Sequence, residues 1–468
     1  MQPKISMVIP CYNKVTSISG MFDSILAQKW DHIELVLVND GSTDSTREIM
    51  AEYELKFRKR GFEVVIIDQK NMGVAGAVRE GFRHVSGDYV CQVDADDALD
   101  CEYISKMVGY LLEHPEYDWV ACDNMRCNNG LQIYYDTFPR GIDPEKILAD
   151  YILHRVANAI WLYVIKRRYF FQCISLDSFY IDRYCAQEAQ IAMPLFVGGG
   201  KLAYIREPLY QYKLYDTQIH KSVWHTYVEK RTHFIFLLNA HAETVKNLSL
   251  NNDKKMYYYR LIQLAMIRHI LSAALGEVEA ESDTRTWIQG LIQVSNDSIE
   301  PAPNIQPNQI RHPYLLLCAL INVITGEQPK VLPPYNRVIA WGVLGNIAQK
   351  NITAFNGTPF EPSVLWDKAG DGITVKKPDV TSLHKDDLVF IVPIRIGVIS
   401  SIRKSLADAG HTNLITYDEA MTQLSMREYP DFYDGSRRFV PKGSIEKTLL
   451  EWVKELEVKA ANCVVSDM

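Results

Sequence analysis

The sequence has no long apolar run and no block of basic residues. Residues 314–324 form an apolar stretch, but it is far shorter than the roughly 20 residues that a membrane-spanning helix needs. Lys and Arg total 50 against 57 Asp and Glu, which gives a net charge of −7. Because nucleic acids are bound through clustered Lys and Arg, we expect no nucleic-acid partner. The short basic run at residues 166–168 is too small to change that expectation.

Paired cysteine spacings are missing as well. The nine cysteines are odd in number and scattered, without the closely spaced pairs of a zinc site. Such a set fits a reducing compartment. Residues 4–10 have a strand-like pattern and not the apolar core of a signal peptide. We therefore expect a cytoplasmic protein, and the sequence leaves open contact with the inner face of the membrane and homo-oligomerisation.

The chain of 468 residues is too long for a single ordinary core. Its 47% of hydrophobic residues is ample for several globular domains. Strand and helix patterns alternate in residues 1–225, a helical pattern follows in residues 226–330, and alternation returns in residues 331–468. The sequence thus predicts an α/β protein of three parts, the first built on a mainly parallel sheet.

The most informative stretch is residues 89–97, where a buried strand ends in an acidic motif. Asp94, Asp96 and Asp97 follow the strand-forming residues directly. Carboxylates are poor core residues, and several together suggest oxygen ligands for Mg²⁺ or Mn²⁺ beside a phosphate. A solvated turn or a helix N-cap explains the same residues without any ligand. The residues at the ends of the neighbouring strands help to distinguish these interpretations.

Polar residues follow three earlier strands in the same way. The pattern predicts strands at 5–8, 33–38, 63–67 and 89–93, and helices at about 16–28, 46–58 and 74–84. The residues at the strand ends are Tyr12 and Asn13, Asp40, Asn71 and Gly73, and Asp94 and Asp96. In such alternating folds the carboxyl ends of parallel strands share one edge, where ligands bind. We therefore expect these side chains to lie close together.

Four ordered motifs resemble those of family 2 glycosyltransferases, which have a GT-A fold. They are residues 8–13, residues 38–44, residues 71–75 with Arg79 and Gly81, and residues 87–97. The resemblance is strong over about the first 125 residues and weaker to Ile219. It implies transfer of a sugar, with inversion, from a nucleotide diphosphate, usually UDP, to a hydroxyl of a glycan or lipid-linked acceptor in the synthesis of surface polysaccharides or glycoconjugates.

The resemblance also implies roles for the residues at the strand ends. The implied nucleotide-binding residues are Pro10, Tyr12, Asn13, Asp40, Asn71, Gly73, Arg79 and Asp94. Asp96, with Asp94, would hold Mn²⁺ or Mg²⁺. A divalent cation makes chemical sense there because the departing diphosphate gains negative charge as the sugar bond breaks. Asp97 is expected only to cap a following helix.

The catalytic base is harder to assign, because the family's Glu-Asp pair is incomplete. The matching positions are Gln187 and Glu188, and Glu188 is the only acid available in either register of the match. We predict that Glu188 is the general base, with Asp182 as the reserve candidate. His220 is a further metal candidate, since the family commonly has a His after the aromatic segment that ends at Tyr212. The aromatic residues of 159–167 fit either sugar stacking or core packing.

The last part of the chain resembles a Rossmann-like module appended to some bacterial glycosyltransferases. Strands are predicted at 337–342, 364–367, 375–378, 388–393 and 413–416. Gly342 and Gly345 keep only part of the dinucleotide-binding fingerprint, and Leu344 stands where a pyrophosphate would approach. Asp367, in contrast, lies at a plausible position to bind a ribose. We do not expect an NAD-type dinucleotide here.

Two other functions remain open at this point. A sugar nucleotidyltransferase also places Asp residues and a metal on an α/β fold, but residues 11–13 replace the glycine-rich and basic loop that it needs. The second open function is that of a nucleotide-binding scaffold protein that has lost its catalytic base. Gln187 favours it, because the family's acidic pair is incomplete there. Released pyrophosphate distinguishes the first, and nucleotide binding without turnover distinguishes the second.

Overall fold

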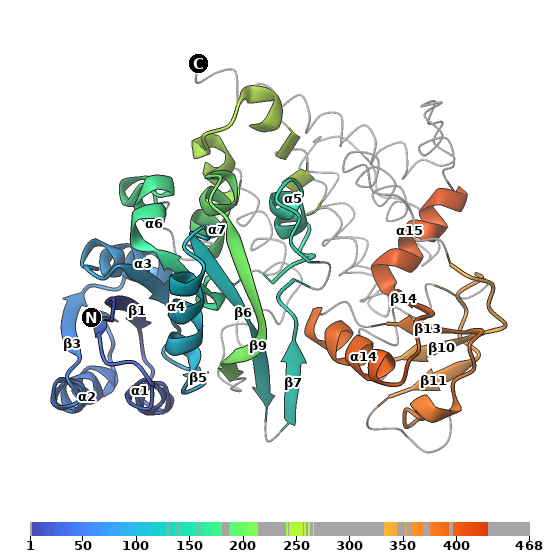
Figure 1. Ribbon diagram of the computed structural model, residues 1–468, viewed down its shortest axis with the longest axis horizontal. Helices are drawn as coiled ribbons and strands as arrows, with labels where there is room; N and C mark the ends of the chain where they lie inside the picture. The colour runs from blue at the N-terminus through green and yellow to red at the C-terminus, as the bar shows by residue number, and fades with distance from the viewer. Residues whose placement is uncertain are drawn as a thin grey trace, which may run out of the picture. The chain divides into compact units, whose positions relative to one another are not determined.

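The computed structural model describes most of the first 213 residues and several stretches nearer the C-terminus. Described are residues 2–128, 131–138, 141–157, 159–179, 187–213, 240–241, 243–255, 257–258, 261–262, 265, 332–343, 352, 355, 358–367, 375–392 and 396–428. Contacts divide the chain into two compact units. The first holds β1 to β9 and the second holds β10 to α15 (Figure 1). The predicted division at residues 225 and 330 stays a prediction.

Four parallel strands form the first half of the larger sheet. They are β1 (Ile5–Cys11), β2 (Ile33–Asp40), β3 (Glu63–Gln69) and β4 (Tyr89–Gln92), in the spatial order β3-β2-β1-β4. Every residue of β2 is buried, as expected for a parallel strand covered on both faces. All four strands predicted for this region are therefore present, and their carboxyl ends share one edge of the sheet.

The sheet continues with strands of mixed direction. Its remaining strands are β5 (Ala98–Leu99), β6 (Trp119–Asn128), β7 (Leu131–Tyr135), β8 (Tyr163–Lys166) and β9 (Leu202–Lys213). The order runs on from β4 through β8, β6 and β9 to β5, while β7 pairs with β6. Strand β8 is antiparallel to β4 and β6, whereas β6 and β9 are parallel. The expectation of parallel strands holds for β1 to β4, and the complete sheet is mixed.

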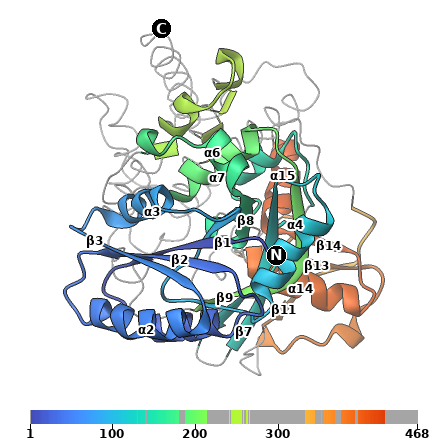
Figure 2. The same ribbon diagram turned by 60° about the vertical axis from the view of Figure 1, so that its left-hand side comes forward.

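Helices cover both faces of the parallel half. The helices of this unit are α1 (Ile18–Leu26), α2 (Thr46–Arg60), α3 (Gly73–Arg83), α4 (Tyr103–Glu113), α5 (Ile147–Ile152), α6 (Arg167–Cys173) and α7 (Gln187–Val197), with short turns η1 (Ile160–Leu162) and η2 (Leu176–Ser178). Figure 2 shows α2 below β1 to β3 and α3 above them. The helices expected near 16–28, 46–58 and 74–84 are thus present as α1, α2 and α3.

A glycine lets α3 approach the sheet closely. A Cβ atom on Gly81 would lie 2.4 Å from Val8 Cγ1 and 3.2 Å from Val38 Cγ2. Real Cβ atoms do not approach carbon so closely, so any larger residue would push the helix away from β1 and β2. Because α3 begins at Gly73, this contact also fixes the loop that carries the predicted nucleotide-binding residues.

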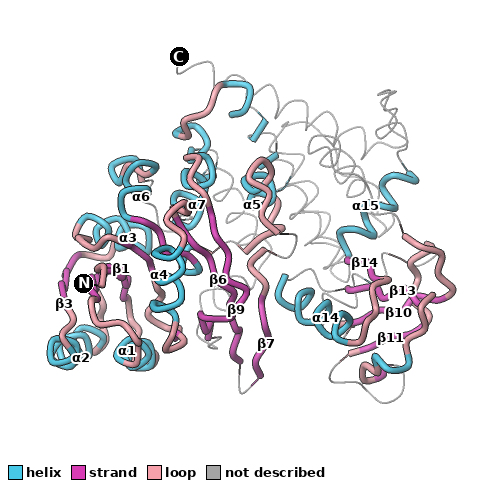
Figure 3. Tube along the Cα trace, viewed as in Figure 1, coloured by secondary structure: helices cyan, strands magenta, loops and turns pink. Residues whose placement is uncertain are grey.

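The second unit is a smaller, fully parallel sheet. It contains β10 (Arg337–Trp341), β11 (Val364–Trp366), β12 (Val375–Lys376), β13 (Asp387–Ile391) and β14 (Leu414–Thr416), with η3 (Val380–Ser382), α14 (Ile396–Asp408) and α15 (Tyr417–Glu428). The order β12-β11-β10-β13-β14 is 3-2-1-4-5 in chain order, the arrangement of a Rossmann-like unit. All five predicted strands are present. Figure 3 draws the strands of this unit in magenta.

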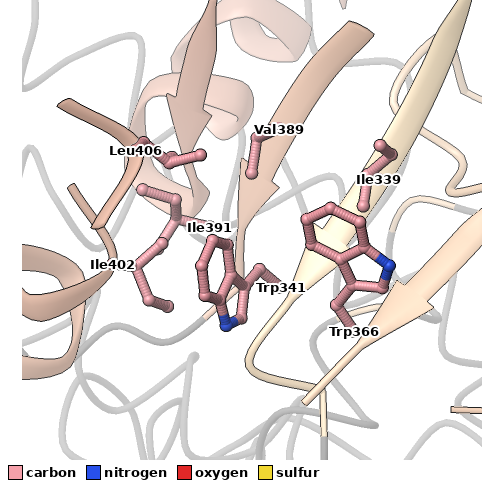
Figure 4. Packing of buried hydrophobic residues seen from close by; sticks show 7 residues of the cluster. All are labelled: Ile339, Trp341, Trp366, Val389, Ile391, Ile402 and Leu406. Carbon is pink, nitrogen blue, oxygen red and sulfur yellow. The ribbon is translucent and has the colours of Figure 1, made fainter. Parts of the chain in front are cut away.

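One hydrophobic cluster holds this second sheet to α14. Trp341 and Trp366 meet edge to face, with ring centres 5.6 Å apart, and Ile402 and Leu406 of α14 pack beside them (Figure 4). Ile339, Val389 and Ile391 complete the cluster, and all of these side chains are nearly or fully buried. Burial of this apolar area stabilises the unit by the hydrophobic effect.

Several predictions lie outside the described residues. They are Asp182, His220, Leu344, Gly345, most of the helical region at 226–330 and the helix expected near 444–461. Among the helices that the structure describes, none is long and apolar enough to cross a membrane.

Candidate functional site

Hydrogen bonds join the loops that follow β1 and β2. Asn13 has a left-handed backbone with φ of 50°, which Asn tolerates better than most residues. Its Oδ1 accepts a hydrogen bond from the Thr43 N–H at 2.8 Å, and its own N–H donates to Ser42 Oγ at 3.2 Å. Tyr12, the preceding residue, has 44% of its surface exposed. An exposed aromatic ring at this edge is available to stack on a ligand.

Asp40 joins the end of β2 to the loop after β3. Its Oδ1 accepts hydrogen bonds from Gln69 Nε2 at 2.7 Å and from the Met72 N–H at 2.8 Å. Within the same loop, Asn71 Oδ1 accepts a hydrogen bond from the Gly73 N–H at 3.2 Å, and Gly73 has φ of 74°, which a side chain disfavours. Asp40, Asn71 and Gly73 therefore lie together where the loop after β3 meets the end of β2.

The acidic motif after β4 meets a lysine from the loop after β1. Lys14 Nζ lies 2.5 Å from Asp96 Oδ2. The pKa of Asp94 is raised to about 6, first by burial and then by the charge of Asp96, with Lys14 acting in the opposite direction. Lys14 was not among the predicted site residues, although it directly follows Asn13 in the first motif.

Two carboxylates and the adjacent lysine fit a site for a divalent cation shared with a ligand. No three His, Cys, Asp or Glu side chains of the described residues come together as a complete metal cage. Mg²⁺ is commonly held by one or two carboxylates plus substrate phosphates and water, so a complete cage is not required. The ammonium of Lys14 already lies at Asp96, which shows that this position favours a positive charge.

Asp97 is not the helix cap that its position in the sequence suggested. The chain continues into strand β5, and Asp97 is fully buried. It accepts hydrogen bonds from the Tyr210 hydroxyl at 2.7 Å and from the Lys213 N–H at 2.9 Å. Burial, followed by the charges of Asp94 and Asp96, raises its pKa well above the usual value. Asp97 therefore fixes β9 to the acidic motif, a long-range contact that local sequence patterns do not reveal.

Tyr210 completes this link between β9 and the motif. Its hydroxyl accepts a hydrogen bond from the Asp94 N–H at 3.1 Å while it donates to Asp97. Trp161 stacks on Tyr210 with ring centres 4.3 Å apart, and on Tyr212 with ring centres 5.5 Å apart. Trp161 and Tyr163, the two aromatic residues of segment 159–167, are both buried. They therefore pack in the core.

Glu188 lies in the first turn of α7 and is electrostatically coupled to the acidic motif. Burial raises the pKa of Glu188 to about 7, and the charge of Asp94 contributes to the rise. A small part of its surface remains exposed. A carboxyl group with this pKa exchanges its proton near neutrality, as a general base must. Glu188 is thus close enough to Asp94 for the two charges to interact, and its role as the base stays a prediction.

Arg79 lies on α3, within two turns of Gly73. Its Nε is buried and has no hydrogen-bond partner among the described residues. An unpaired buried N–H costs on the order of 1–3 kcal/mol, so a ligand that accepts from it is favoured. Pro10, the remaining predicted nucleotide-binding residue, lies in β1 opposite Val38 of β2.

A cavity of about 680 Å³ lies elsewhere in the first unit and contains none of the predicted site residues. It is lined by parts of α6, η2, α7 and residues 243–249. The α7 residues that line it are Gln190, Pro194 and Val197. Their spacing puts them on the face of the helix opposite Glu188. The cavity is therefore separate from the acidic motif.

Comparison with known proteins identifies the first part of the chain. Residues 6–174 match the family model described as "Glycosyl transferase family 2". Residues 6–174 are a family 2 glycosyltransferase domain. The matched region contains the loops after β1 to β4 and the acidic motif, so the resemblance seen in the four motifs is confirmed. The mixed sheet of this domain is GT-A-like, as predicted.

Curated relatives match over part of their length. Glycosyltransferase GlyA of Streptococcus pneumoniae serotype 4 is 26% identical over 297 residues, which cover 61% of this chain and 40% of GlyA. The poly-beta-1,6-N-acetyl-D-glucosamine synthase of Staphylococcus epidermidis is 30% identical over 126 residues, covering 27% of this chain and 29% of the synthase. The chain thus spans less than half the length of either relative.

Among solved structures, S. aureus TarS residues 1–349 in complex with UDP-GlcNAc is 15% identical. The match covers 69% of this chain and 86% of the TarS chain, with a TM-score of 0.48.

Proposed function

We propose that this chain is a metal-dependent, inverting glycosyltransferase. It transfers a sugar from a nucleotide diphosphate, with UDP as the first choice, to a hydroxyl of a glycan or lipid-linked acceptor in polysaccharide or glycoconjugate synthesis. The family match of residues 6–174 supports the reaction class. The relatives named as glycosyltransferases and as a polysaccharide synthase support the setting.

Residues of the loops after β1 to β3 bind the nucleotide in this proposal. Tyr12 stacks on the base, and Asp40 accepts a hydrogen bond from it through Oδ2, because the hydrogen bonds from Gln69 and Met72 both go to Oδ1. Asn13, Asn71 and Gly73 hold the loops in shape, and the unpaired Nε of Arg79 donates to the nucleotide. Pro10 lines the same pocket.

Asp94 and Asp96 would hold Mn²⁺ or Mg²⁺ in this proposal. When bound, such a cation stabilises the negative charge that develops on the leaving diphosphate. Lys14, which pairs with Asp96, would have to release that carboxylate for the cation to bind there. Asp97 and Tyr210 position the motif through their hydrogen bonds and make no contact with the reacting atoms in this proposal.

Glu188 acts as the general base. The acceptor hydroxyl oxygen attacks the anomeric carbon as the bond from that carbon to the diphosphate oxygen breaks, and the hydroxyl proton passes to the Glu188 carboxylate. Attack from the face opposite the leaving group inverts the anomeric centre. The observation that carries the proposal is the pairing of Glu188, with a pKa of about 7, with the acidic motif of a family 2 domain.

The direct test is to measure UDP release from a panel of UDP-sugars with and without Mn²⁺. We expect slow hydrolysis of at least one donor without any acceptor, and its loss in Asp96→Asn. Asp31→Asn, a change at an exposed carboxylate of the same domain, serves as the matched control.

Two results would overturn the assignment. Release of pyrophosphate from a sugar phosphate and a nucleoside triphosphate would make the chain a nucleotidyltransferase. Tight UDP binding with manganese but no turnover of any donor would make it a binding protein.

A further inference from the structure

An arginine near the acidic motif has no hydrogen-bond partner among the residues that the structure describes. Arg126 lies on β6, opposite Tyr212 of β9. Its Nε is buried, and no residue that the structure describes forms a hydrogen bond or an ion pair with it. A guanidinium carries five N–H donors, and a buried donor left unpaired is costly. The described part of the protein supplies no acceptor for this group, so a bound ligand that accepts from it is favoured.

Two tyrosine rings hold this guanidinium in place. Arg126 Cζ lies 3.8 Å from the centre of the Tyr135 ring and 5.3 Å from that of Tyr212. Tyr212 in turn stacks on Trp161 with only 6° between the ring planes. A guanidinium that lies over aromatic rings keeps its N–H groups in its own plane, directed away from the rings. Arg126 is partly exposed, so a ligand can reach that edge.

The same strands connect Arg126 to the acidic motif. Tyr212 lies two residues after Tyr210, whose hydroxyl bonds to both the Asp94 N–H and Asp97. Residues two apart on a strand generally share a face of the sheet. Burial, followed by the charge of Asp97, raises the pKa of Tyr212 to about 12, and the charge of Arg126 opposes the rise. The Tyr212 hydroxyl is thus within electrostatic reach of both groups.

A second unpaired polar group lies on the same strand. Asn124 is only 1% exposed, and its Oδ1 has no hydrogen-bond partner among the residues that the structure describes. Asn124 is two residues from Arg126 on β6 and pairs with Tyr210 of β9. An amide oxygen beside a guanidinium suits a ligand that presents a hydroxyl next to a negatively charged group.

The position of Arg126 in the sheet points to the acceptor and not to the nucleotide. The loops assigned to the nucleotide follow β1, β2 and β3, which form one end of the strand order. Strands β6 and β9 lie on the other side of β4, whose end carries the acidic motif. A ligand at Arg126 therefore approaches the acidic motif from the side away from the nucleotide loops.

We propose that Arg126 binds an anionic group of the acceptor, a carboxylate or a phosphate, through the N–H groups at the free edge of its guanidinium. The inference rests on the proposed glycosyltransferase function and narrows its acceptor to an acidic glycan or a phosphate-bearing one. Arginine binds both oxyanions with two parallel hydrogen bonds, which gives orientation as well as affinity.

The test measures acceptor binding by isothermal titration calorimetry on the protein saturated with UDP and Mn²⁺. The probes are a glucuronate-terminated disaccharide with its glucose-terminated counterpart, and glucose 6-phosphate with glucose. We expect wild type to bind one acidic probe about tenfold more tightly than its neutral counterpart. The first pair reports a carboxylate acceptor and the second a phosphate acceptor. Arg126→Gln should remove the preference, and Arg126→Lys should keep part of it.

Arg206→Gln is the matched control. Arg206 is an exposed arginine on β9 that also lies over a tyrosine ring, with Cζ 5.5 Å from the centre of Tyr204. The control removes a positive charge of the same kind from the same sheet. It should keep the full preference for the acidic probe, because the proposed contact is made by Arg126.

Three results would overturn the inference. They are equal binding of acidic and neutral probes by wild type, an unchanged preference in Arg126→Gln, and loss of UDP binding in Arg126→Gln with its fold intact. The titrations are repeated without UDP. If UDP and Mn²⁺ fail to bind wild type while the preference for acid persists, the glycosyltransferase proposal fails and the role of Arg126 in anion binding stands.

Discussion

Burial makes the charged form of Glu188 costly, and the resulting rise of its pKa is the reason why we propose it as the general base. Its pKa of about 7 lies above the ordinary 4.5, chiefly because of burial. A carboxyl group with a raised pKa stabilises the fold at low pH, where both folded and unfolded chains are protonated. That contribution is lost as the pH rises through about 7, since the charged form is the one that burial disfavours.

Replacing Glu188 by Gln should therefore abolish turnover and also stabilise the protein at alkaline pH. Loss of a general base typically costs about 10²- to 10⁴-fold in rate. At pH 8 the variant should gain on the order of 1–2 kcal/mol in unfolding free energy over wild type, and at pH 4 nothing. Thermal unfolding at both pH values measures the gain, with Glu113→Gln on the exposed end of α4 as the control. Normal turnover would move the base elsewhere, and Asp182 would be the next candidate.

The pH dependence of wild-type turnover gives a separate check on the same residue. A base with a pKa near 7 is charged above that value and protonated below it. Donor turnover should fall about tenfold for each pH unit below 6 while circular dichroism shows an intact fold. A profile that is flat between pH 5 and pH 8 would contradict the assignment of Glu188.

Lys14 is predicted to compete with the metal for Asp96. Its ammonium lies 2.5 Å from Asp96 Oδ2, where a cation would bind. In the nucleotide-free protein, Lys14→Met should bind Mn²⁺ about tenfold more tightly, because the competing positive charge is gone. Titration of Mn²⁺ followed by electron paramagnetic resonance measures this. Lys29→Met, which removes an exposed lysine paired with Glu102, is the control and should change nothing. Unchanged or weaker Mn²⁺ binding in Lys14→Met would rule out the competition.

At the residue scale, the sequence predicted the groups that lie in motifs and missed those that act through distant contacts. Asp40, Asn71 and Gly73 were predicted correctly as neighbours, because strand ends in a parallel sheet must meet. Lys14 and Arg126 were not singled out. A lysine or arginine on a loop or strand is common, and only the fold reveals what it contacts.

Among the elements, β9 is the one on which the geometry of the acidic motif depends. It lies more than 100 residues further along the chain, yet Tyr210 and Lys213 of β9 bond to Asp97. Asp97 looked like a helix cap from its neighbours alone. Contacts between residues so far apart leave no pattern in the local sequence. The sequence therefore pointed to Asp94 and Asp96 but not to the contacts that hold the motif in place.

Tyr210→Phe should weaken this link. The change removes a hydroxyl that donates to Asp97 and accepts from the Asp94 N–H, and it leaves the buried Asp97 short of one donor. We expect a loss of roughly 1–3 kcal/mol in unfolding free energy, together with weaker metal-dependent nucleotide binding. Urea unfolding measures the first effect, and Tyr110→Phe on α4 is the control. A loss below about 0.5 kcal/mol would mean that the hydroxyl has no structural role.

Helix and strand positions were predicted well in both units because alternating patterns are strong local signals. In the first unit the sequence did not predict that the strands after β4 run in mixed directions. Direction depends on how the chain returns to the sheet, and the residues of β6 to β9 do not encode that locally. In the second unit, five parallel strands followed directly from the alternation.

At the scale of the whole molecule, the two α/β units offer two possible nucleotide sites. The first has an acidic motif, a lysine and a carboxyl group coupled to it. The second has the strand order of a dinucleotide-binding fold but only part of the glycine fingerprint. We therefore propose that the chemistry takes place in the first unit.

One measurement tests that assignment most directly: thermal unfolding of wild type and Asp96→Asn with UDP or NAD, each with and without Mn²⁺. A ligand at a hundredfold excess over its Kd adds about 2.7 kcal/mol, a shift of a few degrees. We expect a rise in Tm for wild type that needs both UDP and Mn²⁺ and is absent in Asp96→Asn. A rise with NAD alone, or an equal rise in Asp96→Asn, would contradict it.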